Sequence, residues 1–160
     1  MIGIGNEYRS DDGAGVVVAR RIRERARSSC VVCETGGEGT ALMELWRHAD
    51  DVILIDAVSS GAVPGTIHTF HPSKQPLPTE LFLFSSHAFG LVQAIEISRV
   101  LNELPRQMII YGIEGENFEM GTELSPAVQE SLDDAVDKAL THISTVQQTI
   151  LSSPRSNVLT

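Results

Sequence analysis

Cysteine is scarce in this chain, with two residues, Cys30 and Cys33, among 160. Two cysteines cannot build a disulfide framework, which argues against a small secreted, disulfide-stapled fold and favours a reducing compartment. Aromatic residues make up 5% of the sequence, and no apolar run approaches the roughly 20 residues that a membrane-spanning helix needs. The first residues also lack the basic and apolar regions of a signal peptide. We therefore expect a cytoplasmic protein with no membrane partner.

Positive charge is also in short supply. The chain has 12 lysine and arginine residues against 21 aspartate and glutamate residues, a formal net charge of −9. Such a surface offers little to phosphate backbones, so no nucleic-acid partner is expected. An acidic field favours cationic partners instead, such as metal ions or basic peptides.

The length of 160 residues and a hydrophobic content of 42% fit a single globular domain. Residues 1–150 are predicted to form this domain. Residues 151–160 contain a Ser-Ser-Pro sequence and no apolar period, so they are predicted to form a flexible tail.

Strand and helix patterns alternate along the chain. Strands are predicted over residues 1–5, 30–34, 51–56, 66–70 and 107–113, and helices over residues 11–27, 40–48, 86–104 and 126–150. The link between the third and fourth strands is too short for a parallel crossover, so the fourth strand should run antiparallel to a neighbour. The sequence predicts an α/β fold: a doubly wound three-layer sandwich whose five-stranded sheet is mostly parallel, with one antiparallel strand.

Candidate functional residues follow the apolar segments. Asp11 and Asp12 come after the first strand, Asp56 closes the third, and His87 follows an apolar stretch at residues 81–84 that we interpret as a strand. Ligands of doubly wound sheets bind beyond the carboxyl ends of the strands. Two carboxylates and an imidazole suit a divalent first-row metal ion. Simpler readings stay open, because acids suit the first turn of a helix and histidine suits a helix start, but Asp56 at the end of a buried strand needs a partner.

Five sequence blocks, in order, resemble the hydrogenase maturation proteases. The opening block, Gly3-Ile4-Gly5-Asn6 followed by Ser10-Asp11-Asp12-Gly13-Ala14-Gly15-Val16, resembles the family pattern G-x-G-N…D-[DE]-G-x-G. The other blocks are Thr35-Gly36-Gly37 with Gly39, Ile55-Asp56-Ala57 with Pro64-Gly65-Thr66, Ser86-His87 with Gly90-Leu91, and Gly112-Ile113-Glu114-Gly115-Glu116 with Leu124-Ser125-Pro126. Together they span most of the chain.

The resemblance implies an endopeptidase that removes the C-terminal extension of a nickel-iron hydrogenase large subunit after nickel insertion. It implies that Asp12, Asp56 and His87 are the metal-binding residues, and we predict that the same three residues are catalytic. We expect Asp11 to help set the turn or the local charge. The nickel is implied to belong to the substrate precursor, so we expect that the protease can be isolated without it. The partner is then the large-subunit precursor, and we expect the protease to be a monomer.

A phosphoacceptor receiver-type signalling domain is the alternative, with an acidic pocket formed by Asp11, Asp12 and Asp56. Such a domain needs a cation after its last strand to hold the phosphoryl group. Glu114 occupies that place here, which favours the protease.

The remaining cysteines and histidines carry weaker signals. Cys30 and Cys33 have the spacing of a metal site, but residues three apart on a strand point to opposite faces, which favours a packed, reduced pair. His68 and His71 either border the cleft or occupy solvent-exposed polar positions.

Overall fold

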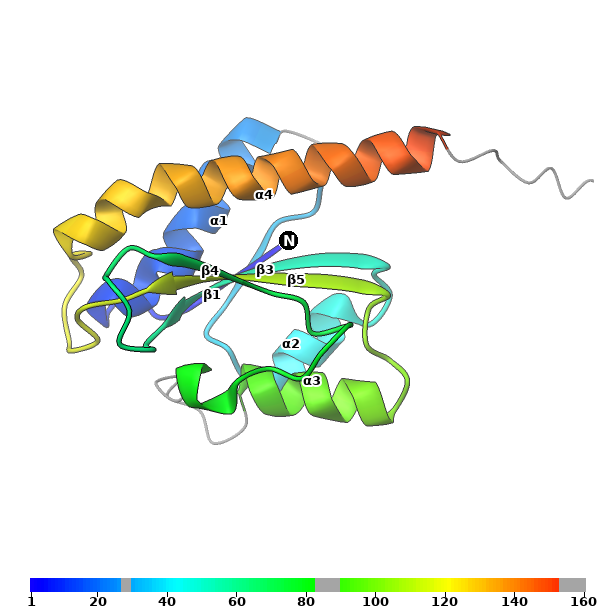
Figure 1. Ribbon diagram of the computed structural model, residues 1–160, viewed down its shortest axis with the longest axis horizontal. Coiled ribbons are helices and arrows are strands. Elements are labelled where there is room, and N and C mark those ends of the chain that lie inside the picture. Colours follow the sequence, from blue (N-terminus) through cyan, green and yellow to red (C-terminus); the bar gives the residue numbers. More distant parts are fainter. Residues whose placement is uncertain (27–29, 83–89, 153–160) are drawn as a thin grey trace, which may run out of the picture.

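One five-stranded sheet organises the structure, a computed structural model that describes residues 1–26, 30–82 and 90–152. Its strands are β1 (Ile2–Ile4), β2 (Cys33–Thr35), β3 (Asp51–Val58), β4 (Ile67–Phe70) and β5 (Gln107–Glu114). The helices are α1 (Ala14–Ala26), α2 (Gly39–Trp46), α3 (Leu91–Val100) and α4 (Pro126–Ser152), with two short 3-10 helices, η1 (Ser10–Gly13) and η2 (Thr79–Phe82). Figure 1 shows their arrangement.

The strand order across the sheet is β2-β1-β3-β5-β4. β1 pairs in parallel with β2 and β3, and β3 pairs in parallel with β5 over its whole length, from Asp51 opposite Gln107 to Val58 opposite Glu114. β4 runs antiparallel to β5 at the sheet edge, with Ile67 opposite Ile113. The predicted mostly parallel sheet with one antiparallel strand is confirmed.

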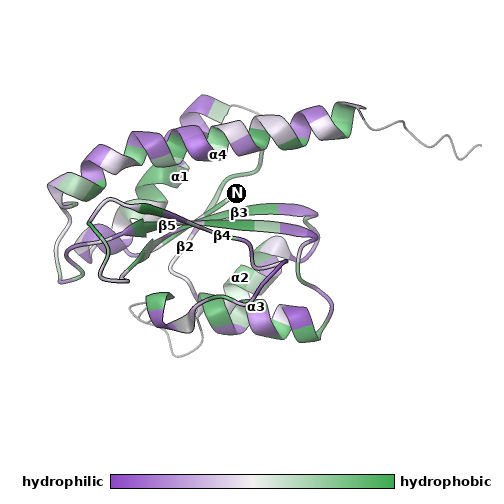
Figure 2. Ribbon diagram, in the orientation of Figure 1, coloured by the Kyte–Doolittle hydropathy of each residue, from purple (hydrophilic) through white to green (hydrophobic). Residues whose placement is uncertain are grey.

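Helices cover both faces of the sheet, and alternate strand residues pack on opposite layers. Ile53 and Ile55 of β3 belong to the core cluster under α1 and α4, whereas Val52 and Leu54 belong to the cluster over α2. Figure 2 shows hydrophobic residues concentrated in the central strands, while hydrophilic and hydrophobic positions alternate along α4. The three-layer prediction is therefore confirmed.

Helical spacing explains how α1 and α4 pack. Both helices bury apolar residues every three or four positions, so each helix has a single apolar stripe that faces the core. The buried apolar residues include Val16, Ala19, Ile22 and Ala26 of α1, and Val128, Leu132, Val136, Ala139 and Ile143 of α4. Pro126 occupies the first position of α4, where its missing N–H costs no hydrogen bond.

Several predicted boundaries were wrong. Asp11 and Asp12 lie in η1, not in an α-helix, which begins only at Ala14. The second strand begins at Cys33 rather than residue 30, and α3 ends at Val100, just before Asn102 adopts a left-handed conformation.

The apolar stretch at residues 81–84 was interpreted as a strand, yet residues 81 and 82 belong to η2. A short apolar run does not distinguish a strand from a helical turn by its pattern. Residues 83 and 84 lie outside the described part of the chain.

The C-terminal boundary stays a prediction. α4 continues to Ser152, and residues 153–160 lie outside the described residues, so the division into a domain and a tail is not tested. None of the described helices combines the length and the apolar content needed to cross a bilayer.

Candidate active site

Two of the three predicted site residues lie at the carboxyl edge of the sheet. Asp12 lies in η1, which follows β1, and Asp56 lies on β3, two residues before its end. β1 and β3 are neighbours in the sheet, with Gly3 opposite Ile55. Both carboxylate residues are buried, with exposed fractions of 8% for Asp12 and 4% for Asp56. The predicted edge of the sheet therefore carries two buried acids, Asp56 on β3 and Asp12 in the turn that follows the neighbouring strand β1.

Glycines bring the turn carrying Asp12 close to the sheet. Gly5 has a φ of +143°, and a Cβ atom there would lie 1.8 Å from the carbonyl oxygen of Asp12. Gly15 lets α1 approach the strands, since its Cβ would lie 2.3 Å from the carbonyl oxygens of Ile4 and Ile55. The glycines of the opening sequence block thus permit the close approach of η1 and α1 to β1 and β3.

The two acids interact electrostatically. Burial, with a further contribution from the charge of Asp12, raises the pKa of Asp56 from 3.8 to about 7, although the N–H of Ala57 partly opposes this shift. That N–H donates to Oδ1 of Asp56 at 2.9 Å, and the Asn6 N–H donates to Oδ2 of Asp12 at 3.2 Å. A divalent cation between the carboxylates would relieve their repulsion. The donor chemistry therefore fits a metal ion.

Asp11 has a different role from Asp12. Its buried carboxylate accepts hydrogen bonds from the backbone N–H groups of Glu116, Asn117 and Ser125, and from the Ser125 hydroxyl. Burial alone would raise the pKa of Asp11, but these hydrogen bonds outweigh it and lower the pKa below 3.8. Asp11 therefore fastens η1 to the loop between β5 and α4.

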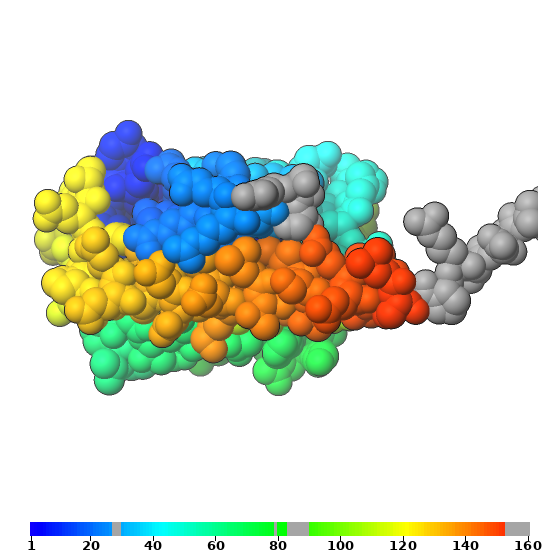
Figure 3. Space-filling model, turned by 90° about the horizontal axis from the view of Figure 1, so that it is seen from above, coloured from blue at the N-terminus to red at the C-terminus, as the bar shows by residue number. Residues whose placement is uncertain are grey.

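More bonds join the same two segments. Ser10 donates its N–H to the Gly121 carbonyl at 2.8 Å, and the Arg9 guanidinium donates to the Phe118 carbonyl. The Gly121 N–H donates in turn to the Tyr8 carbonyl at 3.0 Å. In Figure 3 this loop, in yellow, lies beside the blue N-terminal segment at one end of the molecule. The turn that carries Asp12 is held from outside by a segment more than 100 residues away in sequence.

The third predicted residue, His87, lies outside the described residues. Within residues 1–26, 30–82 and 90–152, no three histidine, cysteine, aspartate or glutamate side chains are grouped closely enough to hold a metal ion. Asp12 and Asp56 therefore form an acidic pair, and the site with His87 as its third member stays a prediction.

Sequence reasoning missed the structural role of Glu114. This residue ends β5 with 1% exposure, and its carboxylate accepts from the backbone N–H groups of Ser60 and Gly61 at 2.7 and 2.9 Å. It also accepts from the Ser60 hydroxyl at 2.7 Å and from Nε2 of His68 at 3.0 Å. Burial alone would raise the pKa of Glu114, but these hydrogen bonds lower it. The signal was available, because Glu114, like Asp56, is an acid at the end of a buried strand.

Replacing Glu114 with alanine should destabilise the fold strongly, because it removes a buried acceptor that makes four partly buried hydrogen bonds to the turn after β3 and to His68. We expect the free energy of unfolding, measured in urea, to fall by about 3–5 kcal/mol. Glu114→Gln keeps one oxygen for the backbone donors and should cost less. The control is Glu116→Ala, at an exposed position two residues later; equal losses in the two alanine variants would contradict the role of Glu114.

Comparisons with known proteins identify the family. A family model described as hydrogenase maturation protease matches residues 16–142. The chain belongs to the hydrogenase maturation protease family. This is a family of peptide-bond hydrolases, so the predicted family and enzyme class are confirmed.

Individual relatives agree with this family. The hydrogenase 2 maturation protease of Escherichia coli is 29% identical over 146 residues, which cover 88% of this chain and 87% of that protein. The hydrogenase expression/formation protein HupD of Thiocapsa roseopersicina is 25% identical over 146 residues, or 89% of this chain. This chain spans only 66% of the length of that HupD.

Solved structures share the fold. An endopeptidase from Escherichia coli superposes with a TM-score of 0.73 at 27% identity and covers 88% of each chain. The hydrogenase maturating endopeptidase HybD of Escherichia coli gives a TM-score of 0.74 at 24% identity over 91% of each chain, which supports the fold alone. Membership of the protease family, together with Glu114 at the end of β5, favours the protease over the receiver-type alternative.

The two cysteines are free and lie on opposite sides of the sheet. Cys30 packs against the core cluster under α1 and α4, and Cys33 packs against the cluster over α2. The prediction that they point to opposite faces is confirmed, so they do not form a metal clip together.

Proposed function

We propose that this chain is an endopeptidase that removes the C-terminal extension of a nickel-iron hydrogenase large subunit after nickel has been inserted. The observation that carries the proposal is the buried pair of Asp12 and Asp56, in a chain that belongs to the maturation protease family. One acid of this pair has a pKa of about 7, so the pair resists carrying two negative charges at neutral pH. A divalent ion brought by the substrate stabilises the two negative charges, so both carboxylates can be ionised at neutral pH.

Nickel is part of the substrate in this proposal and is not a resident cofactor. Asp12 and Asp56 bind the ion that the precursor presents, and His87 supplies an imidazole, a ligand that suits nickel. The ion increases the affinity of the site for the precursor, so cleavage is tied to completed nickel insertion. These three residues are then both the metal-reading and the catalytic residues of the peptidase.

Asp12 and Asp56 are held in position in different ways. Asp12 lies on a turn held by Asp11, Ser10 and Arg9, so its carboxylate is positioned before substrate arrives. Asp56 lies on β3 in the middle of the sheet, where pairing with β5 holds its backbone in place. A preorganised pair of this kind binds the ion without a large loss of side-chain entropy.

Incubation of the protein with nickel-loaded and nickel-free precursor tests the proposal. We expect release of the C-terminal peptide, detected by mass spectrometry, from the nickel-loaded form only. Asp12→Asn should lower the rate at least about 100-fold, because removing a direct ligand costs more than the roughly 10–100-fold loss for a residue that only supports one.

The matched control is Asp134→Asn, which removes an exposed carboxylate of α4 and should leave processing unchanged. Equal cleavage of both precursors would contradict the nickel-reading step. Cleavage of neither precursor would contradict the proposed activity.

A further inference from the structure

A pocket of about 320 Å³ opens at the end of the sheet opposite the candidate active site. It lies where β4 ends and β5 begins, and α4 borders it from one face of the sheet. Its lining comes from three parts of the chain: His71, Ser73 and Lys74 of the turn after β4, residues 106–109 at the start of β5, and His142 of α4. Asp12 and Asp56 lie at the carboxyl ends of the strands, so this pocket is separate from them.

The turn after β4 is fastened to the start of β5. The Ser73 hydroxyl donates to the Pro105 carbonyl at 3.0 Å and accepts from the Met108 N–H at 3.0 Å. The Lys74 N–H donates to the His71 carbonyl at 2.9 Å, which closes the turn itself. Two walls of the pocket, more than 30 residues apart in sequence, are therefore held in a fixed relation before a ligand arrives.

Positive charge gathers in this pocket, although the chain as a whole has a formal net charge of −9. Lys74 and Arg106 line it, and none of the described acidic residues does. Both residues are exposed, and within residues 1–26, 30–82 and 90–152 neither side chain has a hydrogen bond or an ion pair. The other described arginines each bind a carboxylate or a carbonyl oxygen: Arg9, Arg20, Arg21, Arg23, Arg25, Arg47 and Arg99. Lys74 and Arg106 are therefore available to bind an anion from solvent.

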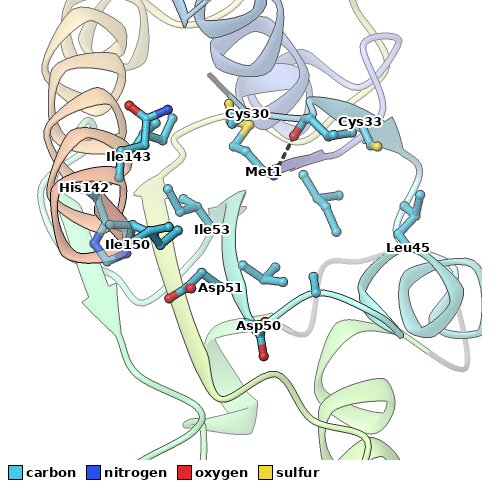
Figure 4. Close-up of a pocket in the computed structure, with 16 residues that line it drawn as sticks. Met1, Cys30, Cys33, Leu45, Asp50, Asp51, Ile53, His142, Ile143 and Ile150 are labelled. Carbon is cyan, nitrogen blue, oxygen red and sulfur yellow. Dashed lines mark hydrogen bonds between the residues drawn. The ribbon is translucent and has the colours of Figure 1, made fainter. Parts of the chain in front are cut away.

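His142 adds an imidazole from the α4 side of the pocket. Figure 4 centres on the neighbouring cavity, which shares His142, and shows this imidazole beside β5. Burial lowers the pKa of His142 from 6.5, the charge of Asp51 opposes this shift, and His71 adds to it. The His142 ring is therefore neutral at pH 7 and offers one N–H as a donor. The effect of His71 also indicates that the two imidazoles lie near each other.

The donors in this pocket suit a phosphate group. A guanidinium binds phosphate or carboxylate oxygens through paired N–H groups, and an ammonium adds a mobile point charge. A phosphate carried by an ester has three strong acceptor oxygens and up to two negative charges, whereas a carboxylate has two oxygens and one charge. Donors on three sides of the pocket can contact all three phosphate oxygens at once.

The size and the apolar part of the lining indicate what the phosphate is attached to. The volume of about 320 Å³ is near the lower limit for small-molecule sites, roughly 300 Å³. Met108 and Ile109 line the pocket and are buried apolar residues. A small carbon group beside the phosphate can therefore lie against them.

We propose that this pocket binds a small phosphate monoester, with Arg106 and Lys74 holding the phosphate oxygens. His71 and His142 donate to the same group from the turn and from α4. The assignment is independent of the proposed function, because the pocket lies at the amino end of β5 and the acidic pair lies at the other edge of the sheet.

Three probes test the pocket: phenyl phosphate, inorganic phosphate and benzoate, each titrated into the full chain at pH 7 and physiological salt. The amide NMR signals of Lys74 and Gln107 report binding. We expect phenyl phosphate to bind at least about tenfold more tightly than benzoate, because it offers more charge and more acceptor oxygens. It should also bind more tightly than inorganic phosphate, because its ring contacts Met108 and Ile109.

Substitutions locate the binding. Arg106→Gln should weaken the binding of phenyl phosphate at least about tenfold, and Lys74→Gln by a similar factor, because each removes a charged hydrogen-bond donor. Both positions are exposed, so the variants should fold normally. The matched control is Arg47→Gln, which removes an exposed arginine paired with Glu44 at the end of α2 and should leave the affinity unchanged.

The absence of a saturable change at Lys74 and Gln107 would overturn the proposal. Equal binding of benzoate and phenyl phosphate would overturn the phosphate assignment, and equal binding of inorganic phosphate and phenyl phosphate would overturn the ester. A loss in Arg47→Gln as large as that in Arg106→Gln would show that binding follows overall charge and not this pocket. Losses confined to the Arg106 and Lys74 variants, with phenyl phosphate the tightest probe, support the site.

Discussion

Asp56→Asn should abolish processing of nickel-loaded precursor and at the same time stabilise the protein in the absence of nickel at pH 8. We expect the processing rate to fall at least about 100-fold, because the variant loses one of the two carboxylates that we propose bind the ion. We expect the thermal midpoint at pH 8 to rise by roughly 5–10 °C. A variant that gains stability while losing activity is typical of a residue kept for function.

The stability gain follows from the direction of the Asp56 pKa shift. Burial first, and the charge of Asp12 second, raise the folded-state pKa from 3.8 to about 7. Below pH 3.8 Asp56 is protonated in both the folded and the unfolded state, so it does not lower the free energy of unfolding. The loss grows as the pH rises from 3.8 toward 7 and reaches roughly 4 kcal/mol above that. Asparagine carries no charge at any pH, so the variant escapes this cost.

Thermal unfolding of wild type and Asp56→Asn between pH 4 and pH 8 measures the effect. The difference in midpoint should grow with pH and vanish near pH 4. Asp51→Asn is the matched control, since Asp51 lies on the same strand at the opposite edge of the sheet. A constant difference across the whole pH range would contradict the interpretation of Asp56.

Asp11→Ala should lower the free energy of unfolding by on the order of 3–5 kcal/mol and displace the turn that carries Asp12. The substitution removes the acceptor for three backbone N–H groups and one hydroxyl, and a buried donor left without an acceptor is costly. Because the hydrogen bonds lower the pKa of Asp11, its ionised form stabilises the fold above pH 3.8. This contribution is lost as the pH falls through the lowered pKa.

Urea unfolding at pH 7 and at successively lower pH, together with the rate of precursor processing, tests Asp11. Asp11→Asn should lose less stability than the alanine variant, since it keeps one carbonyl oxygen, and its deficit should shrink in acid below pH 3.8. Glu119→Gln changes an exposed acid on the same loop and serves as the control. Wild-type processing and wild-type stability in Asp11→Ala would contradict the role of Asp11 in holding the turn that carries Asp12.

The positions of Asp12 and Asp56 at one sheet edge followed from strand ends alone. In a parallel sheet the carboxyl ends of neighbouring strands meet, and the run from Asp51 to Val58 is apolar enough to identify its strand without tertiary information. The antiparallel direction of β4 followed in the same way from a short connection. Local pattern and chain length carried both inferences.

The hydrogen bonds that hold the site in place could not be predicted from the sequence. The four hydrogen bonds to Asp11 come from residues 105 to 114 positions away, and no periodicity relates an acid in a turn to such a distant loop. The bond between Glu114 and His68 spans 46 residues and depends on the register between β4 and β5, which sequence reasoning did not assign. Boundaries such as that of η2 failed because a four-residue apolar run fits a helical turn as well as a strand.

The Asp11–Ser125 contact also has a consequence for the order of events during synthesis. It closes a loop of 114 residues, so the entropy of bringing its ends together must be met before the turn with Asp12 is fixed. A chain still emerging from the ribosome has β1 and η1 early but has no residue 125 to hold them. The turn that carries Asp12 therefore gains this support only after residue 125 has been made.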